Sequence, residues 1–134
     1  MRLFAAWALA AVLAGAMPEG YWAAQEPFAL KKDQFAVWNN GGKTLTFRWT
    51  LFHNRALVTL TKYDRFPYQH LLYREYRKDG MKIPLTEEKA ADRMAPYVYI
   101  RFKDFDEEKQ EGSFILYLYD PKGSVKLMRE EGEQ

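Results

Sequence analysis

The chain of 134 residues contains no cysteine, so it can form neither a disulfide nor a cysteine-based metal site or lipid anchor. Candidates for nucleophilic catalysis are also scarce. Ser113 and Ser124, the only serines, lie outside any Gly-x-Ser-x-Gly motif, and His53 and His70 lack the spacing of a metal-binding pair. We therefore expect no catalytic residue, no metal and no cofactor. An enzyme, such as a hydrolase, is the least favoured function.

The sequence also lacks an N-glycosylation sequon. The absence of both a sequon and cysteine favours a bacterial periplasmic or secreted protein over a eukaryotic secretory one. The formal net charge is only +2 and there is no run of basic residues, which argues against nucleic acid as a partner. Positive charge gathers in residues 43–78 and negative charge in residues 79–134, a split that ordinary solvated strand faces and loops explain.

One long apolar run is present, at the N-terminus. Residues 3–16 carry no charge, follow Arg2, and end in the small-x-small sequence Ala14-Gly15-Ala16 that signal peptidase accepts. A membrane-spanning helix needs about 20 apolar residues, more than this run provides. We therefore expect a signal peptide over residues 1–16, with cleavage after Ala24 as an alternative, and no membrane span after cleavage.

The remainder has the length of one domain. Residues 17–27, which contain Pro18 and Pro27, suggest a flexible leader. Residues 28–134 are then a single β-rich domain.

The clearest strand lies within a β-hairpin over residues 43–63. In the sequence TLTFRWTLF, apolar and polar side chains alternate, so that Leu45, Phe47, Trp49 and Leu51 share one face. This is the period of a half-buried strand, and Phe47 and Trp49 are expected in the core. Turn residues at 39–42 and 53–56 flank the strand on either side.

Further short strands are expected over residues 34–38, 81–85, 97–105, 114–119 and 125–128. The count is seven or eight, joined by tight turns, with at most one short helix near 86–94. Strands that follow one another so closely pair mainly antiparallel. The expected fold class is all-β, either a small β-sandwich or an up-and-down barrel.

Residues 64–78 are ambiguous. Asp64 is a possible helix cap, Pro67 suits a first helical turn, and Gly80 suits a helix end. The density of tyrosine and phenylalanine, and a proline directly after a turn, favour a strand instead. We predict a strand here.

The same segment is the best candidate binding surface, because aromatic and basic residues interleave along it. Tyrosine and arginine dominate interface hot spots, since they bury a large area and keep a polar tip. Ordinary core aromatics covered by arginine stems would give the same composition. The candidate binding residues are Arg65, Phe66, Tyr68, His70, Tyr73, Arg74, Tyr76 and Arg77.

These features favour a non-catalytic exported module that binds or assembles with another envelope protein through this segment or its strand edge. The alternative is a carrier of a small apolar ligand or glycan, in a cavity lined by Trp38, Trp49 and tyrosines. The acidic residues of 104–111 are expected to form a solvated loop rather than a calcium site.

Overall fold

The computed structural model describes residues 22–75, 77–86 and 93–130. Within these ranges every regular element is a β-strand, and no helix long and apolar enough to cross a membrane occurs. The expected signal peptide and most of the helix expected near 86–94 lie outside the described residues. The all-β fold class is therefore confirmed for the part of the chain that the structure describes.

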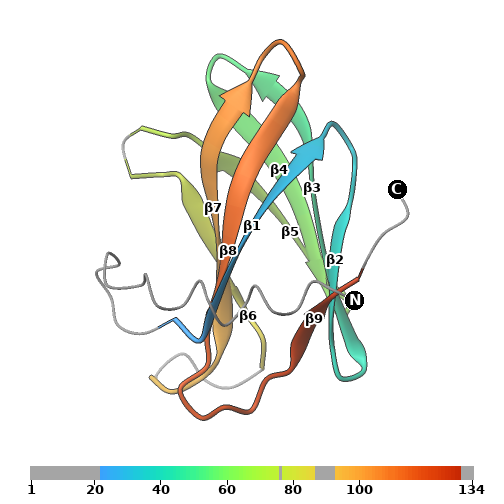
Figure 1. Ribbon diagram of the computed structural model, residues 1–134, viewed down its shortest axis with the longest axis vertical. Coiled ribbons are helices and arrows are strands. Elements are labelled where there is room, and N and C mark those ends of the chain that lie inside the picture. The colour runs from blue at the N-terminus through green and yellow to red at the C-terminus, as the bar shows by residue number, and fades with distance from the viewer. Residues whose placement is uncertain (1–21, 76, 87–92, 131–134) are drawn as a thin grey trace.

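The strands form two sheets (Figure 1). One sheet has four strands in the order β1 (Ala24–Lys31), β8 (Glu111–Tyr119), β7 (Tyr97–Asp106), β6 (Gly80–Pro84). The other has five in the order β5 (Phe66–Leu72), β4 (Ala56–Tyr63), β3 (Lys43–His53), β2 (Ala36–Asn40), β9 (Leu127–Arg129). All neighbours pair antiparallel, and each described strand belongs to one sheet. This arrangement is a β-sandwich rather than a closed barrel.

Side chains of both sheets fill the space between them, because each strand turns alternate residues inward. Phe47 and Trp49 are buried as expected, beside Trp38 and Ile100. The indole N–H groups of the two tryptophans between the sheets are satisfied: Trp38 donates to Glu26 Oε1 at 3.0 Å, and Trp49 donates to the carbonyl oxygen of Leu30 at 2.8 Å. These two hydrogen bonds fix the orientation of both rings within the core.

The hairpin predicted over residues 43–63 is confirmed, but one of its side chains is on the other face. A β-bulge lies between Trp49 and Leu51, so that Thr50 is the extra residue on β3. Because the side-chain period is two, one inserted residue reverses the face of all that follow. Leu51 therefore points outward and is 51% exposed, whereas Phe52 packs against the core.

The flexible leader was predicted to end at residue 27, but the folded domain begins earlier. Residues 24–27 belong to β1 and pair with β8, and Trp22 is already buried. The domain therefore begins before residue 28, and the described strands number nine rather than seven or eight. The strand missed by sequence reasoning is β1. Pro27 sits within it, which an edge strand tolerates because its free side needs no N–H donor.

Candidate functional site

The predicted strand within residues 64–78 is confirmed as β5, which is an edge of the five-stranded sheet. Among the described strands it pairs with β4 alone, and it belongs to a different sheet from β6, the next strand along the chain. Exposed edges are commonly protected by charged side chains, especially lysine. The sequence of β5, FPYQHLL, has no charged residue.

The backbone of β5 offers hydrogen-bonding groups along this edge. Tyr63 and Phe66 flank the two-residue turn between β4 and β5, and the pairing then continues without a bulge. The pair next to such a turn is hydrogen-bonded, and antiparallel pairs alternate from there. The backbone groups of Pro67, Gln69 and Leu71 therefore point away from β4. Pro67 has no N–H, so the free edge of β5 comprises the donors of Gln69 and Leu71 and three carbonyl acceptors.

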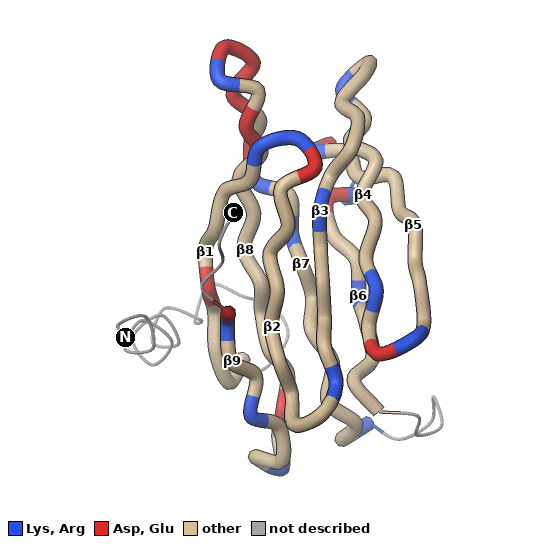
Figure 2. Tube along the Cα trace, turned by 90° about the vertical axis from the view of Figure 1, so that its right-hand side faces the viewer, with Lys and Arg blue, Asp and Glu red and all other residues tan. Residues whose placement is uncertain are grey.

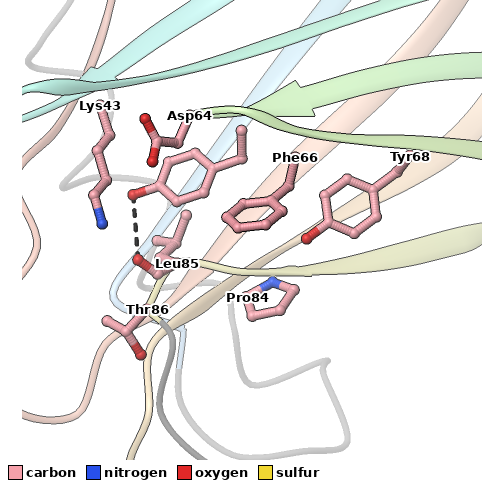
Figure 3. Close-up of a pocket in the computed structure, with 8 residues that line it drawn as sticks. Lys43, Asp64, Phe66, Tyr68, Pro84, Leu85 and Thr86 are labelled. Atoms are coloured by element: carbon pink, nitrogen blue, oxygen red, sulfur yellow. Dashed lines mark hydrogen bonds between the residues drawn. The ribbon is translucent and has the colours of Figure 1, made fainter.

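A pocket of about 190 Å³ lies beside the N-terminal half of β5, between this strand and the end of β6 (Figure 3). Phe66 and Tyr68 turn their rings toward Pro84, which comes from the opposite sheet. We call it the β5–β6 pocket, and it is lined by Lys43, Tyr63, Asp64, Phe66, Tyr68, Pro84, Leu85 and Thr86.

One wall of the β5–β6 pocket is fixed by two hydrogen bonds of the Tyr63 hydroxyl, and one of them joins the two sheets. The Tyr63 hydroxyl donates to the carbonyl oxygen of Leu85 at 3.2 Å and accepts from Asn40 Nδ2 at 3.0 Å. Tyr63 is only 4% exposed. These contacts hold the two sides of the pocket at a set separation, so the pocket exists before any ligand arrives.

Charged groups surround the mouth of the pocket. Lys43, at the start of β3, and Asp64, in the β4–β5 turn, are both part of its wall. Arg65 follows Asp64 and is exposed. Among the described residues, none of these three forms an ion pair. With Lys62 close by on β4, the described charges at this end of the sheet are positive on balance (Figure 2).

The structure divides the predicted binding residues between the two ends of β5. Arg65, Phe66 and Tyr68 lie at the pocket end, where Phe66 is 47% exposed and Tyr68 is half-buried. Phe66 therefore leaves about half of its surface in solvent beside the pocket. Exposed aromatic surface of this kind is typical of recognition sites.

His70 lies between the two ends, half-buried and on the same side of β5 as Tyr68. Its ring stacks against that of Tyr68, with centroids 6.3 Å apart and planes 16° from parallel. Nδ1 is buried and has no hydrogen-bond partner within residues 22–75, 77–86 and 93–130. Burial lowers the pKa of His70 from its usual 6.5, because desolvation disfavours the imidazolium form.

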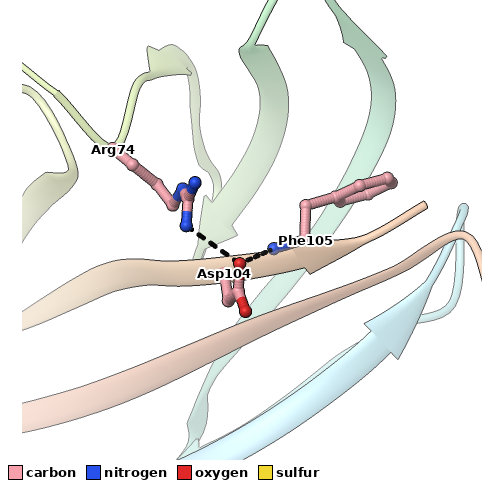
Figure 4. A network of polar contacts seen from close by, with 3 residues as sticks. All are labelled: Arg74, Asp104 and Phe105. Carbon is pink, nitrogen blue, oxygen red and sulfur yellow. Dashed lines mark hydrogen bonds and ion pairs between the residues drawn. The ribbon is translucent and has the colours of Figure 1, made fainter.

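Tyr73, Arg74 and Arg77 lie beyond the other end of β5, roughly 20 Å from the pocket at the usual rise of a strand. There Arg74 forms an ion pair of 2.9 Å with Asp104 of β7 (Figure 4). Both side chains are at least half exposed, so this pair contributes little stability. Tyr76 lies outside the described residues. The predicted set is therefore not one site.

An apolar row on the outer face of the five-stranded sheet leads to the free edge of β5. Leu51, Val58 and Leu71 are directly paired across β3, β4 and β5. Leu51 and Leu71 are each about half exposed. The row ends at β5, where an added strand would continue it.

Sequence reasoning missed the pocket residues that lie outside 63–77: Lys43, Pro84, Leu85 and Thr86. No local pattern marks them, because they meet β5 only through the packing of two sheets. A partial signal was present in the turn after Asn40, which returns the chain at Lys43 to the end of β4.

Other predicted functions find less support in the geometry. Trp38 and Trp49, expected to line the cavity of a carrier, are in the closed core instead. In the acidic loop, Asp106 Oδ1 accepts the backbone N–H groups of Glu108 and Lys109 and so stabilises the turn itself. Over the described ranges, no group of three or more His, Cys, Asp or Glu side chains is arranged to hold a metal ion.

Comparison with known proteins adds no assignment: no family model, no curated protein and no solved structure matches the chain.

Proposed function

We propose that the domain is a non-catalytic binding module that takes up an extended segment of another envelope protein. The segment adds as a strand to the free edge of β5 and places one side chain in the β5–β6 pocket. In strand addition, main-chain hydrogen bonds supply affinity and side-chain pockets supply specificity. The observation that carries the proposal is that a preformed aromatic pocket adjoins an uncharged strand edge.

The details of the edge support this assignment. Backbone donors remain at Gln69 and Leu71, and β5 lacks the charged residues that normally discourage strand pairing. Phe66 and Tyr68 belong to the edge strand and their side chains line the pocket, so one ligand can contact both the edge and the pocket. The filled core favours this surface over an internal ligand cavity.

Replacement of Gln69 by proline tests the role of the edge. Gln69→Pro removes an N–H that points away from β4, and edge strands tolerate proline at such positions. The free energy of unfolding is therefore expected to stay within about 1 kcal/mol of the wild-type value. Pro67 already occupies an equivalent position on β5. The variant is expected to lose the partner, and Gln69→Ala, which keeps the N–H, is expected to retain it.

A photoreactive side chain at Leu71 supplies the readout. It is expected to cross-link a partner segment in wild type and in Gln69→Ala but not in Gln69→Pro, with the adduct located by mass spectrometry. Equal cross-linking in Gln69→Pro would contradict strand addition. Cross-linking to a second copy, with a dimer in sedimentation that Gln69→Pro dissociates, would show that the edge serves self-association and would contradict a heterologous partner.

We propose further that the protein acts outside the cytoplasm after removal of residues 1–16. Burial of Trp22 supports cleavage after Ala16 rather than after Ala24, since the latter would remove Trp22 and the start of β1. Intact-mass measurement of the protein from periplasm is expected to show loss of residues 1–16. Full-length protein recovered from the cytosol would contradict export.

A further inference from the structure

We infer the chemistry of the partner segment, on the basis of the proposed function: it has an apolar side chain opposite Leu71, a ring in the β5–β6 pocket, and a carboxylate next to Lys43. The structure positions three different surfaces along one strand edge, and each selects one of these groups. Their order along β5 fixes the order of the groups in the partner.

The apolar row on the outer face selects the first group. A residue of the added strand directly opposite Leu71 points to the same face as Leu71, Val58 and Leu51. Pairs of β-branched or other apolar residues across strands stabilise a sheet. A valine or isoleucine at this position continues the row and covers the exposed part of Leu71.

The pocket selects the second group. A residue opposite Tyr68 points inward, into the space between β5 and β6, where the β5–β6 pocket opens. Its walls include the rings of Tyr63, Phe66 and Tyr68 and the ring of Pro84. A volume of about 190 Å³ suits one aromatic side chain rather than a whole small molecule.

The charges at the mouth select the third group. Lys43 is half-buried in the pocket wall and has no ion-pair partner among the described residues. Arg65 and Lys62 add positive charge near the same end, where Asp64 in the β4–β5 turn supplies a negative charge. A carboxylate brought to Lys43 gives its ammonium group an acceptor for a charge-assisted hydrogen bond.

Direction follows from strand pairing. Every pair in both sheets is antiparallel, and antiparallel pairing is slightly more stable per residue than parallel pairing. A segment antiparallel to β5 meets Leu71 first, Tyr68 three residues later and Phe66 two residues after that. The pattern is therefore apolar-x-x-aromatic-x-acidic, read from the N-terminus, and the acidic group is either an Asp or Glu side chain or the terminal carboxylate of the partner.

Synthetic peptides test the pattern directly. The probe is acetyl-Thr-Val-Thr-Thr-Phe-Thr-Asp-Thr-amide, compared with the same peptide carrying Thr or Lys in place of Asp. Fluorescence anisotropy is expected to show the Asp peptide binding about tenfold more tightly than the Lys peptide, with the difference reduced at high salt. A second, seven-residue peptide ends at the Asp position and has Thr in place of Asp. It is compared as the free acid and as the amide, and tighter binding of the free acid identifies a terminal carboxylate as a ligand.

Charge-removing variants assign the effect to Lys43. Lys43→Met is expected to abolish the preference for the Asp peptide, whereas Lys103→Met, in the bulge of β7 at the other end of the domain, is expected to retain it. Equal binding of the Asp and Lys peptides, a preference that survives in Lys43→Met, or no binding of any peptide would overturn the inferred pattern. Strand addition itself is judged separately, by the cross-link lost in Gln69→Pro.

Discussion

The rings of Phe52 and Phe105 stack with their centroids 4.0 Å apart and their planes 16° from parallel, although they belong to different sheets. Each ring reaches this position through a β-bulge on its own strand. On β3 the bulge lies between Trp49 and Leu51, and on β7 it lies between Phe102 and Asp104. With strict alternation, Phe52 and Phe105 would both point outward. The two bulges reverse their direction, so the rings face each other between the sheets and extend the core at this end of the sandwich.

This arrangement predicts that truncation at two consecutive positions of β3 has opposite outcomes. Phe52→Ala is expected to lower the free energy of unfolding by about 2–4 kcal/mol, because a packed aromatic ring is lost. Leu51→Ala is expected to change it by no more than about 0.5 kcal/mol, because Leu51 is on the surface. Urea titrations with an unchanged m-value measure both. A larger loss for Leu51→Ala would mean that β3 has no bulge.

A double-mutant cycle isolates the contact between the rings. Phe52→Ala and Phe105→Ala together are expected to cost less than the sum of the single changes, with a coupling of about 0.5–1.5 kcal/mol, as for other stacked aromatic pairs. Additive effects would show that the rings pack on the core independently.

The bulges also explain why the sequence did not predict the face of every side chain. Alternation in Leu45, Phe47 and Trp49 correctly predicts a buried face, because period-two patterning follows directly from strand geometry. Thr50 carries no signal that it is an inserted residue, since threonine suits a regular strand equally well. The register change at Leu51 depends on how β3 pairs with β4, which is a property of two segments rather than one.

The candidate site was predictable to a similar extent. Aromatic and basic composition identified Phe66 and Tyr68 within residues 63–77, but grouped them with Arg74, which lies at the other end of β5. Lys43 and Pro84 join the pocket only because edges of two different sheets meet there. Composition can therefore indicate which strand carries candidate binding residues. Which of those residues share a surface can be known only from the three-dimensional fold.

Glu26 joins the two sheets on the side of the sandwich opposite to β5. Its carboxylate accepts from Trp38 Nε1 at 3.0 Å and pairs with Arg129 at 2.6 Å, and the carboxylate side chain is 13% exposed. Glu26→Gln is expected to lower the free energy of unfolding by about 2 kcal/mol, somewhat less than the loss for a fully buried pair. Calorimetry of Glu26→Gln, Arg129→Met and the double variant is expected to show the double costing less than the sum; strict additivity would contradict the bridge.

Gly80 lies against the ring of Tyr99, on the outer face of the four-stranded sheet. A Cβ atom at Gly80 would come within 2.2 Å of the ring, which is itself in contact with Trp22 and Tyr117. Gly80→Ala is therefore expected to cost about 1–3 kcal/mol, as other overpacking changes do. Tyr99→Ala in the same chain is expected to remove that extra cost. Thermal melts in which Gly80→Ala is equally harmful with and without Tyr99 would show that the glycine is needed for backbone conformation instead.

His70 predicts how stability depends on pH. Burial lowers its pKa in the folded protein below the usual 6.5, so between these two values the unfolded chain binds more protons than the folded one. Stability therefore rises with pH across this window, and it is lost as the pH falls from about 6.5 toward the folded-state pKa.

Replacement of His70 by asparagine is expected to flatten this part of the stability profile, measured as the urea midpoint at intervals between pH 5 and pH 7. His53→Asn is the matched control, since His53 is exposed at the end of β3, and it is expected to keep the wild-type slope. Because His70 lies beside Tyr68, the same protonation would add a positive charge next to the β5–β6 pocket. A slope that persists unchanged in His70→Asn would show that the imidazole is not held neutral by the fold, and would remove this link between pH and the edge of β5.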